Sequence, residues 1–450
     1  MCKLSFSEAH VYFSAAVKTG KDTTKIFEDS QEYTVHSLDG KVSHDGNNSG
    51  DDIWTDCSRK DMESFFYDCA INAIYPDGKL KKEKYFKDIK HYSRKVDSKV
   101  KVSIKNNAGS QEIDVTRVHY FLFPSNILLF SFECNFKNIP ADAYIDACSA
   151  FRDIEHWVYD DGTPRISPEG LSLFDDIVKL HNSGRSEKIE IGDYGKYYTA
   201  LYKFNKLKIY SNIVIPKNPD FKTGYNMDNL LFEAATCSPF GSSSDKSNRF
   251  CPSENYFTNT IEENTLSVFN DWKSLILTDS IVSVHIDDGH HRKMWERFYY
   301  EYIYVGLLFV KTYTLEMTDR FKNSGNDPES LGTEFNSFDK AFNFNNVSFN
   351  FLPQLLYIKI REILSIDREL DWIKNRIDQY NSQILAKRVA LLTAAQIFFL
   401  TISFFGINYT KDCNVPTWIN VIAGLSVMVY FLFSIFYVLK IIWNYFRKCD

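Results

Sequence analysis

The chain has 450 residues, of which 24% are charged and 16% are aromatic, and its formal net charge is -6. This length allows more than one domain, and the charged fraction is that of ordinary globular proteins, which excludes a largely disordered chain. The acidic balance excludes a protein that is basic throughout, so we expect no direct binding to nucleic acid.

Residues 1–52 are predicted to form a short N-terminal segment, because they end in the polar loop Ser43–Asp52. The first apolar stretch, Val11–Val17, is too short for the core of a signal peptide, so we expect the large N-terminal part to stay in the cytosol. Nine scattered cysteines without a CxxC pair agree with reduced thiols in that compartment.

Residues 53–290 are predicted to form an α/β or α+β domain, because strand and helix patterns are mixed along them. The clearest pattern lies between Gln111 and Phe136, where apolar residues alternate on both sides of Pro124-Ser125-Asn126 and indicate a hairpin with one buried face. Further strands are predicted at 189–191, 197–204, 208–215 and 280–286, helices at 141–157 and 171–181, and loops at 236–254 and 323–350.

Four side chains of the types that bind metals follow the last of these strands, namely Asp287, Asp288, His290 and His291. Two carboxylates and two imidazoles this close can bind a divalent metal, and a species bound there could move the long helix that follows. The same residues can instead form a turn and a helix N-cap, because Asp at a helix start interacts favourably with the helix dipole. The spacing matches no standard zinc pattern, and we favour the turn.

Residues 291–388 are predicted to form two long helices. The first runs from about His291 to Lys322, and its apolar middle is too short to cross a membrane. The second starts near Gln354 and is expected to continue without a break into the bilayer. Its apolar residues at a and d spacing favour a self-associating stalk, with packing against its own domain as the alternative. The seam consists of Ile363, Ile366, Leu370, Ile373, Ile377 and Ile384.

Two stretches near the C-terminal end, residues 389–410 and 413–439, contain no Asp, Glu, Lys or Arg. Each exceeds the roughly 20 apolar residues that cross a bilayer as a helix. They predict two transmembrane helices, 389–408 and 418–439, within a membrane part at 389–443 that includes a short outer loop. Basic residues flank the spans and fill the tail 444–450, so we expect a multi-pass protein of the inner (cytoplasmic) membrane with both termini in the cytoplasm.

The first span ends in Gly406-Ile407-Asn408, behind a long helix and ahead of a short loop, a second span and a basic tail. This arrangement resembles the CorA family of divalent-cation channels, whose signature at this place is Gly-Met-Asn, and the resemblance covers residues 354–450. It implies a homopentameric funnel in which the stalk and first span line a pore for Mg²⁺ or another divalent cation, gated by the cytosolic domain. A ring of Asn408 carbonyl oxygens would then bind the waters of the hydrated ion, since Mg²⁺ loses its water reluctantly.

Three features depart from that family: Ile407 replaces Met, Lys411 offsets Asp412 in the outer loop, and the soluble part is longer than usual. They favour a second interpretation, in which the chain resembles membrane effectors of type III CRISPR antiviral defence and binds a nucleotide second messenger in its cytosolic domain. A third interpretation is a membrane-anchored scaffold without a pore. We expect no enzyme, because the sequence has no P-loop, GxSxG or HExxH motif.

Overall fold

The computed structural model describes residues 4–412 with internal gaps, and a few single positions beyond 412. The gaps are 21–22, 39–57, 83–85, 104–109, 159–161, 184, 186, 218, 220, 222–223, 288–293 and 324–327. The chain divides into two compact units, Met1–Asp371 and Trp372–Asp450. The expected loop at 43–52 and most of the expected second span lie outside the described residues.

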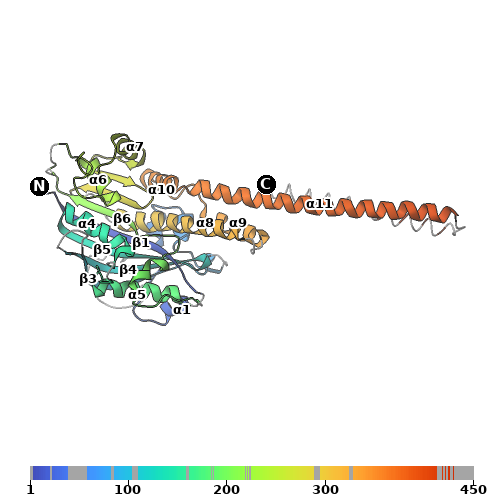
Figure 1. Ribbon diagram of the computed structural model, residues 1–450, viewed down its shortest axis with the longest axis horizontal. Helices are drawn as coiled ribbons and strands as arrows, with labels where there is room; N and C mark the ends of the chain where they lie inside the picture. Colours follow the sequence, from blue (N-terminus) through green and yellow to red (C-terminus); the bar gives the residue numbers. More distant parts are fainter. Residues whose placement is uncertain are drawn as a thin grey trace. The chain divides into compact units, whose positions relative to one another are not determined.

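Among the described residues of the first unit, nine strands form one mixed sheet in the order β2-β3-β4-β5-β1-β6-β9-β8-β7 (Figure 1). The described strand pairs are antiparallel, apart from the parallel pair β6–β9. The strands are β1 (Ser5–Lys18), β2 (Thr34–His36), β3 (Lys90–Ser103), β4 (Ser110–Phe123), β5 (Ile127–Pro140), β6 (Lys208–Ile215), β7 (Thr265–Leu266), β8 (Trp272–Ile276) and β9 (Ser280–Ile286).

The hairpin predicted between Gln111 and Phe136 is confirmed by the antiparallel pair β4–β5. Its turn is the short 3-10 segment η2 (Pro124–Asn126), in which Ser125 and Asn126 have φ values of 63° and 58°. Two consecutive residues with positive φ give a tight turn whose twist matches that of the flanking strands. The strands predicted at 208–215 and 280–286 are also confirmed, as β6 and β9.

One face of the sheet is covered by α4 (Ala141–Arg152), α5 (Pro168–Asn182) and α6 (Met227–Thr236). Every second residue of the central strands packs with these helices in a continuous apolar core, to which Val11, Phe13 and Phe132 belong. The helices predicted at 141–157 and 171–181 are confirmed as α4 and α5, with shifted ends. The first of them stops at Arg152, and η3 (Ile154–His156) follows.

The opposite face is covered by a π-helical segment, η5 (Met294–Val305), and by α8 (Gly306–Lys322), which follows it directly. α9 (Pro328–Phe342) packs on α8, and α10 (Phe351–Ile363) packs on η5 (Figure 1). The first unit is therefore a three-layer α/β/α arrangement. The shorter elements are α1 (Thr23–Glu28), α2 (Arg59–Glu63), α3 (Asp68–Asn72), η1 (Leu80–Lys82), η4 (Tyr194–Ala200) and α7 (Glu254–Asn264).

Three sequence predictions differ from this arrangement. Residues 1–52 do not stand apart, because β1 pairs with β5 and β6 at the centre of the sheet. The strands expected at 189–191 and 197–204 are absent from the described residues there; Gly192 turns the chain with a φ of 92°, and η4 follows. The region 323–350 was expected to be a loop, but it contains α9, because Phe335, Phe338 and Phe342 recur at helical spacing and are buried.

The helix expected to run unbroken from Gln354 into the bilayer is interrupted. α10 ends at Ile363, and α11 (Ile366–Asp412) begins after Ser365, whose φ is 55°. A left-handed residue cannot continue a right-handed helix, so α11 starts with a new direction. Ile363 therefore does not share a helix with the rest of the predicted seam.

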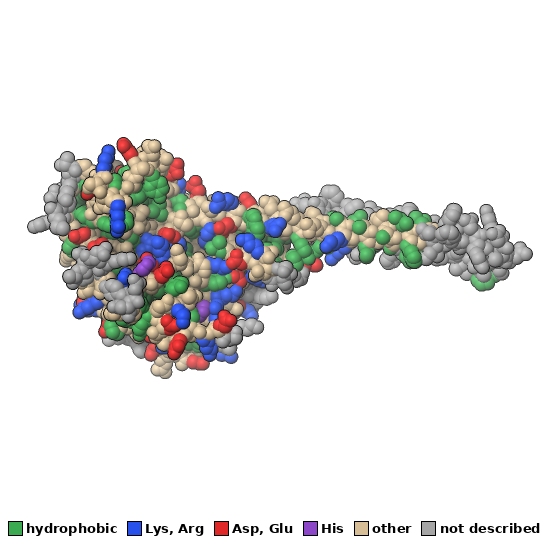
Figure 2. Space-filling model, in the orientation of Figure 1, with side chains coloured by type: hydrophobic (Ala, Val, Ile, Leu, Met, Phe, Trp, Pro, Cys, Tyr) green, Lys and Arg blue, Asp and Glu red, His purple; other side chains and the backbone are tan. Residues whose placement is uncertain are grey.

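α11 is the described helix that is long and apolar enough to cross a membrane, with its candidate span in the stretch Ile366–Leu400. Leu391, Ile397, Phe398 and Leu400 are each more than half exposed. Figure 2 shows Lys and Arg side chains on the early part of α11 and apolar or uncharged side chains on the described part that follows, whereas the visible face of the first unit carries charges of both signs. An α/β domain followed by a C-terminal apolar helix that could span a membrane is thus the architecture of the chain.

Candidate functional site

The sheet face that lies under η5 carries polar side chains although it is buried. Side chains alternate along a strand, so the residues between those of the apolar core point to this face. His10 and Ser14 on β1, Ser131 and Glu133 on β5, and His119 on β4 are all at most 5% exposed. Buried polar groups are stable only with hydrogen-bond partners, so these groups are expected to form a network.

A hydrogen-bonded chain of side chains crosses four neighbouring strands, β1, β5, β4 and β3. Glu133 occupies its centre: His10 Nε2 lies 2.9 Å from one carboxylate oxygen, and His119 Nε2 lies 2.9 Å from the other. The second nitrogen of His119, Nδ1, lies 3.0 Å from His91 Nε2. The His91 ring is stacked on that of His36, with centroids 4.2 Å apart. The imidazoles thus extend from the middle of the sheet to its β2 edge.

The chain leaves the sheet through Tyr75 and reaches the helical layer. The Tyr75 hydroxyl lies 2.7 Å from His91 Nδ1 and is also hydrogen-bonded to Glu301 on η5. Glu301 Oε1 lies 3.2 Å from His91 Nδ1, and Arg297 Nε lies 3.8 Å from Glu301 Oε2. Because His91 and Glu301 are fully buried, this connection between the sheet and η5 is closed to bulk water.

Glu301 on η5 and Glu133 on β5 have opposite pKa shifts. Burial raises the pKa of Glu301, although the charge of Arg297 acts in the opposite direction, and this favours the protonated acid. Burial would also raise the pKa of Glu133, but hydrogen bonds from His10 and His119 hold that pKa below its ordinary value. Glu133 is therefore an ionised carboxylate that accepts two imidazole N–H groups.

Burial lowers the pKa values of His91 and His119 below the usual 6.5, which favours neutral imidazoles between the carboxyl groups. A neutral imidazole donates from one nitrogen and accepts at the other. Since His119 donates to Glu133, its Nδ1 accepts from His91, and His91 Nδ1 accepts from Tyr75. The Tyr75 hydroxyl has one proton for its two partners, His91 and Glu301, so a protonated Glu301 would supply the second hydrogen bond.

Three tyrosines fasten η5 to the same sheet face. Tyr12 donates to the backbone carbonyl of Glu296 at 2.7 Å, and Tyr210 donates to that of Trp295 at 2.9 Å. The rings of Tyr12 and Tyr300 are stacked with centroids 3.6 Å apart. π-Helices are rare and often occur at functional sites. Side chains of the sheet therefore hold this uncommon segment directly over the buried chain.

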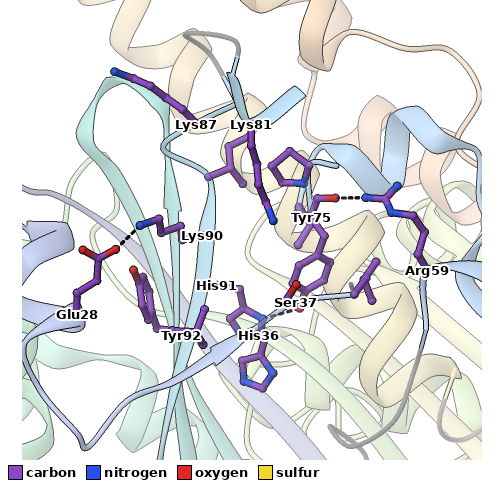
Figure 3. Close-up of a pocket in the computed structure, with 15 residues that line it drawn as sticks. Glu28, His36, Ser37, Arg59, Tyr75, Lys81, Lys87, Lys90, His91 and Tyr92 are labelled. Carbon is purple, nitrogen blue, oxygen red and sulfur yellow. Dashed lines mark hydrogen bonds and ion pairs between the residues drawn. The ribbon is translucent and has the colours of Figure 1, made fainter. Parts of the chain in front are cut away.

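A pocket of about 280 Å³ lies beside the outer end of the chain (Figure 3). Tyr75 and His91, which belong to the chain, also form part of the pocket wall. In Figure 3, Lys81 reaches toward the middle of the labelled residues. The cationic side chains that line the pocket are Arg59, Lys81, Lys87 and Lys90. The pocket therefore presents positive charge next to a buried hydrogen-bonded chain.

A second polar contact lies at the other end of the helical layer, where α8 meets the first turn of α11 within the first unit. Lys311 forms an ion pair with Glu369, and its Nζ donates to the Leu364 carbonyl at 2.8 Å. Thr314 Oγ1 donates to Glu369 Oε2 at 2.6 Å. The Leu364 carbonyl is next to Ser365, where the helix is interrupted, so Lys311 binds a carbonyl at the interruption.

The predicted ion-recognition triplet, Gly406, Ile407 and Asn408, lies inside α11. The backbone is helical through the triplet to Asp412, so the helix does not end in the turn expected at Gly406. A single Gly inside a helix costs only about 1 kcal/mol, which the apolar residues before it can offset. The side chains of the triplet lie outside the described part of the structure.

Of the predicted seam, Ile366, Leu370, Ile373 and Ile377 are buried, whereas Ile384 is half-buried. Of the predicted metal cluster, Asp287 is described: its N–H donates to the Ile215 carbonyl at 2.9 Å, and its φ is 63°. Asp288, His290 and His291 lie outside the described residues. The structure, within the residues it describes, has no group of three or more His, Cys, Asp or Glu side chains placed to hold a metal.

Sequence reasoning missed the buried chain and the basic pocket. One signal was available: His10, His91 and His119 each have an aromatic residue one or two positions later inside a strand-like run, as in His-Val-Tyr, His-Tyr and His-Tyr-Phe. Histidine in such a run marks a buried polar position, but the sequence does not show its partners. No protein-family model matches the chain, and no match is found among curated proteins or solved structures.

Proposed function

We propose that the chain is one subunit of a CorA-like homopentameric membrane channel for divalent cations, with Mg²⁺ as the first choice, gated by its cytosolic α/β/α unit. The observation that carries the proposal is the contact of Lys311 and Thr314 with Glu369. It ties the helical layer to the first turn of α11, the helix that is apolar enough to cross a membrane. A displacement of η5 and α8 would therefore act directly on α11.

The ion would be recognised at Asn408, near the end of the charge-free stretch of α11. One amide oxygen from each of five subunits would bind the first hydration shell of the cation, so that Mg²⁺ need not give up its water. Selection by a neutral ring of this kind needs no acidic residue in the pore, and the stretch 389–410 has none.

Self-association is favoured by an exposed apolar face on α10. Phe351, Leu355 and Ile358 share one side of this helix at i, i+4 and i+7, and they are 61%, 38% and 50% exposed. Phe349, just before the helix, is 54% exposed. Contiguous apolar surface of this kind is typical of protein contacts, and a second copy of the chain is the partner that a homopentamer supplies.

The experiment is Mg²⁺ flux into liposomes that contain the purified full chain. Asn408→Ala should abolish the flux and leave the oligomer size unchanged, because only the ion-binding oxygen is removed. Asn381→Ala, on the same helix but before the charge-free stretch, is the matched control and should conduct normally. Normal flux through the Asn408→Ala protein would contradict the proposal.

The second candidate is a CorA-like membrane effector of type III CRISPR defence, switched by a nucleotide second messenger. The basic pocket beside Tyr75 favours it, because a channel that responds to Mg²⁺ alone has no use for a cluster of cations there. Flux that begins only after a nucleotide is added would support this candidate, whereas flux controlled by Mg²⁺ alone would support the first.

A further inference from the structure

We infer that the pocket beside Tyr75 and His91 is a nucleotide site, in which the cationic side chains bind the phosphate and the apolar wall binds the base. This inference deepens the effector candidate, because an effector of that kind needs a nucleotide ligand. The functional meaning of the site rests on that candidate. Binding itself does not depend on whether the membrane helices conduct ions, so the two can fail separately.

The charge of the pocket favours a phosphate. Four cationic side chains line it against one carboxylate, that of Glu28, which pairs with Lys90 at 2.5 Å. Lys81 and Lys87 are exposed, so they can turn toward a ligand. Arg and Lys bind phosphate oxygens through charge-assisted hydrogen bonds, which are about twice as strong as neutral ones.

Arg59 is already held in place. Its Nη2 donates to Asn72 Oδ1 at 3.1 Å and to the backbone carbonyl of Tyr75 at 2.5 Å. A guanidinium that is fixed before the ligand arrives loses little conformational entropy on binding. The site therefore combines one preorganised cation with two exposed lysines, Lys81 and Lys87, at its rim.

The remaining lining favours a flat, apolar group attached to that phosphate. Half of it is aliphatic, namely Val35, Leu38, Ile74, Pro76 and Ile89, and the other half includes the rings of Tyr75 and Tyr92. The volume of about 280 Å³ is at the lower end of small-molecule sites, which suits a ligand of mononucleotide size. Inorganic phosphate would leave the apolar side chains of the pocket in contact with water, so their burial would add nothing to its binding free energy.

The position of the site gives binding a route to the helical layer. Arg59 holds the backbone of Tyr75, and the hydroxyl of the same Tyr75 is bonded to His91 and Glu301. A phosphate bonded to Arg59 would therefore lie one contact away from the residue that joins the sheet to η5.

The test is binding of a panel of ribonucleoside 5′-mono- and triphosphates to the purified full chain by calorimetry, with inorganic phosphate, ribose 5-phosphate and the free nucleosides as comparison probes. At least one nucleotide should bind at least tenfold more tightly than inorganic phosphate or its own nucleoside. Lys81→Gln should weaken that binding about tenfold. Val35→Trp, which fills the pocket without changing its charge, should weaken it as strongly. Lys95→Gln, an exposed lysine on β3 that does not line the pocket, is the matched control and should bind like the parent.

Three results would overturn the inference. They are the absence of saturable binding by every nucleotide in the panel, equal affinity for inorganic phosphate and nucleotide, and an equal effect of Lys81→Gln and Lys95→Gln. Unfolding midpoints of the variants, measured alongside, separate a lost site from a lost fold. Nucleotide binding without any flux response would leave the site intact and contradict the effector candidate instead.

Discussion

Lys311 on α8 and Glu369 in the first turn of α11 form an ion pair at the point where the chain changes from α10 to α11. Both side chains are about one-fifth exposed, and Thr314 adds a hydrogen bond to the same carboxylate. This small polar cluster fixes the start of the apolar helix to the layer that covers the sheet.

Glu369→Gln should loosen this attachment. It removes the charge opposite Lys311 but keeps the shape, and we expect the free energy of unfolding to fall by about 1.5–3 kcal/mol, as for hydrogen bonds to charged groups. The ligand or cation concentration at which flux switches should shift as well. Glu362→Gln is the matched control, because Glu362 pairs with Lys359 at the surface of α10 and such pairs contribute about 0–1 kcal/mol. Equal behaviour of the two variants in denaturant and flux measurements would contradict the role of Glu369.

Tyr75→Phe should uncouple the sheet from η5. The change removes one hydroxyl, and with it a hydrogen bond to His91 and another to Glu301, both fully buried. The free energy of unfolding should fall by about 1–3 kcal/mol, because His91 and Glu301 are left buried with fewer hydrogen-bond partners. Tyr256→Phe, at a residue of α7 that is 60% exposed, should change it by less than about 0.5 kcal/mol. A switching curve of the Tyr75→Phe channel that matches the parent would show that coupling bypasses this hydroxyl.

Stability should fall as the solution is acidified from pH 7 to pH 5. Burial lowers the pKa values of His36, His91 and His119 below 6.5, so below that pH the unfolded chain binds more protons than the folded one. Each such proton lowers the free energy of unfolding by up to about 1.4 kcal/mol per pH unit. Glu301 offsets part of this loss, because its pKa is raised in the folded state. Glu133 adds a separate loss only below about pH 4.5, because its pKa is lowered in the folded state.

Urea midpoints of the purified chain between pH 5 and pH 8 measure this dependence. His91→Gln should reduce the slope, since one imidazole no longer titrates on unfolding. His156→Gln, at a half-exposed histidine outside the buried chain, is the matched control. A free energy of unfolding that stays constant from pH 7 to pH 5 would rule out neutral buried imidazoles.

The double change Ile373→Asp, Ile377→Asp should destabilise the N-terminal part of α11 and hold the proposed channel in one state. Both side chains are buried, and replacing each with a carboxylate removes apolar contacts that typically contribute about 2–5 kcal/mol per site. Asn375→Asp, Gln379→Asp adds the same charges at exposed positions of the same helix and should leave oligomer size and flux unchanged. If both double variants match the parent in light scattering and flux, the seam has no structural role.

The strands that could be predicted from the sequence are those in which one face is apolar and buried and the other face carries fewer apolar residues. β4 and β5 were found because apolar residues alternate along them, and the break at Pro124–Asn126 marks their turn. β1 was missed because Val11, Tyr12 and Phe13 are apolar in succession and both of its faces are buried, so no alternation is visible. The π-helical winding of η5 has no periodic signal that separates it from an ordinary helix.

The buried chain could not be predicted because its contacts join distant parts of the sequence. His10 is 123 residues from Glu133, and Tyr75 is 226 residues from Glu301. Only the strand order, with β1 between β5 and β6, brings the first pair together. By contrast, the long apolar helix was predictable, since the absence of charge over 389–410 is a local property.

The winding of η5 determines which way α8 faces. In a π-helix each N–H donates to the carbonyl five residues earlier instead of four, and one residue of an α-helix corresponds to about 100° of rotation. Suppose that η5 rewound toward an α-helix by one residue while Tyr12 and Tyr210 kept its first residues bound to the sheet. α8 would then rotate about its own axis by about 100°. Lys311 would then face away from Glu369. A change in the number of residues per turn within this twelve-residue segment would therefore be transmitted from the sheet, which holds one end of it, to the start of α11.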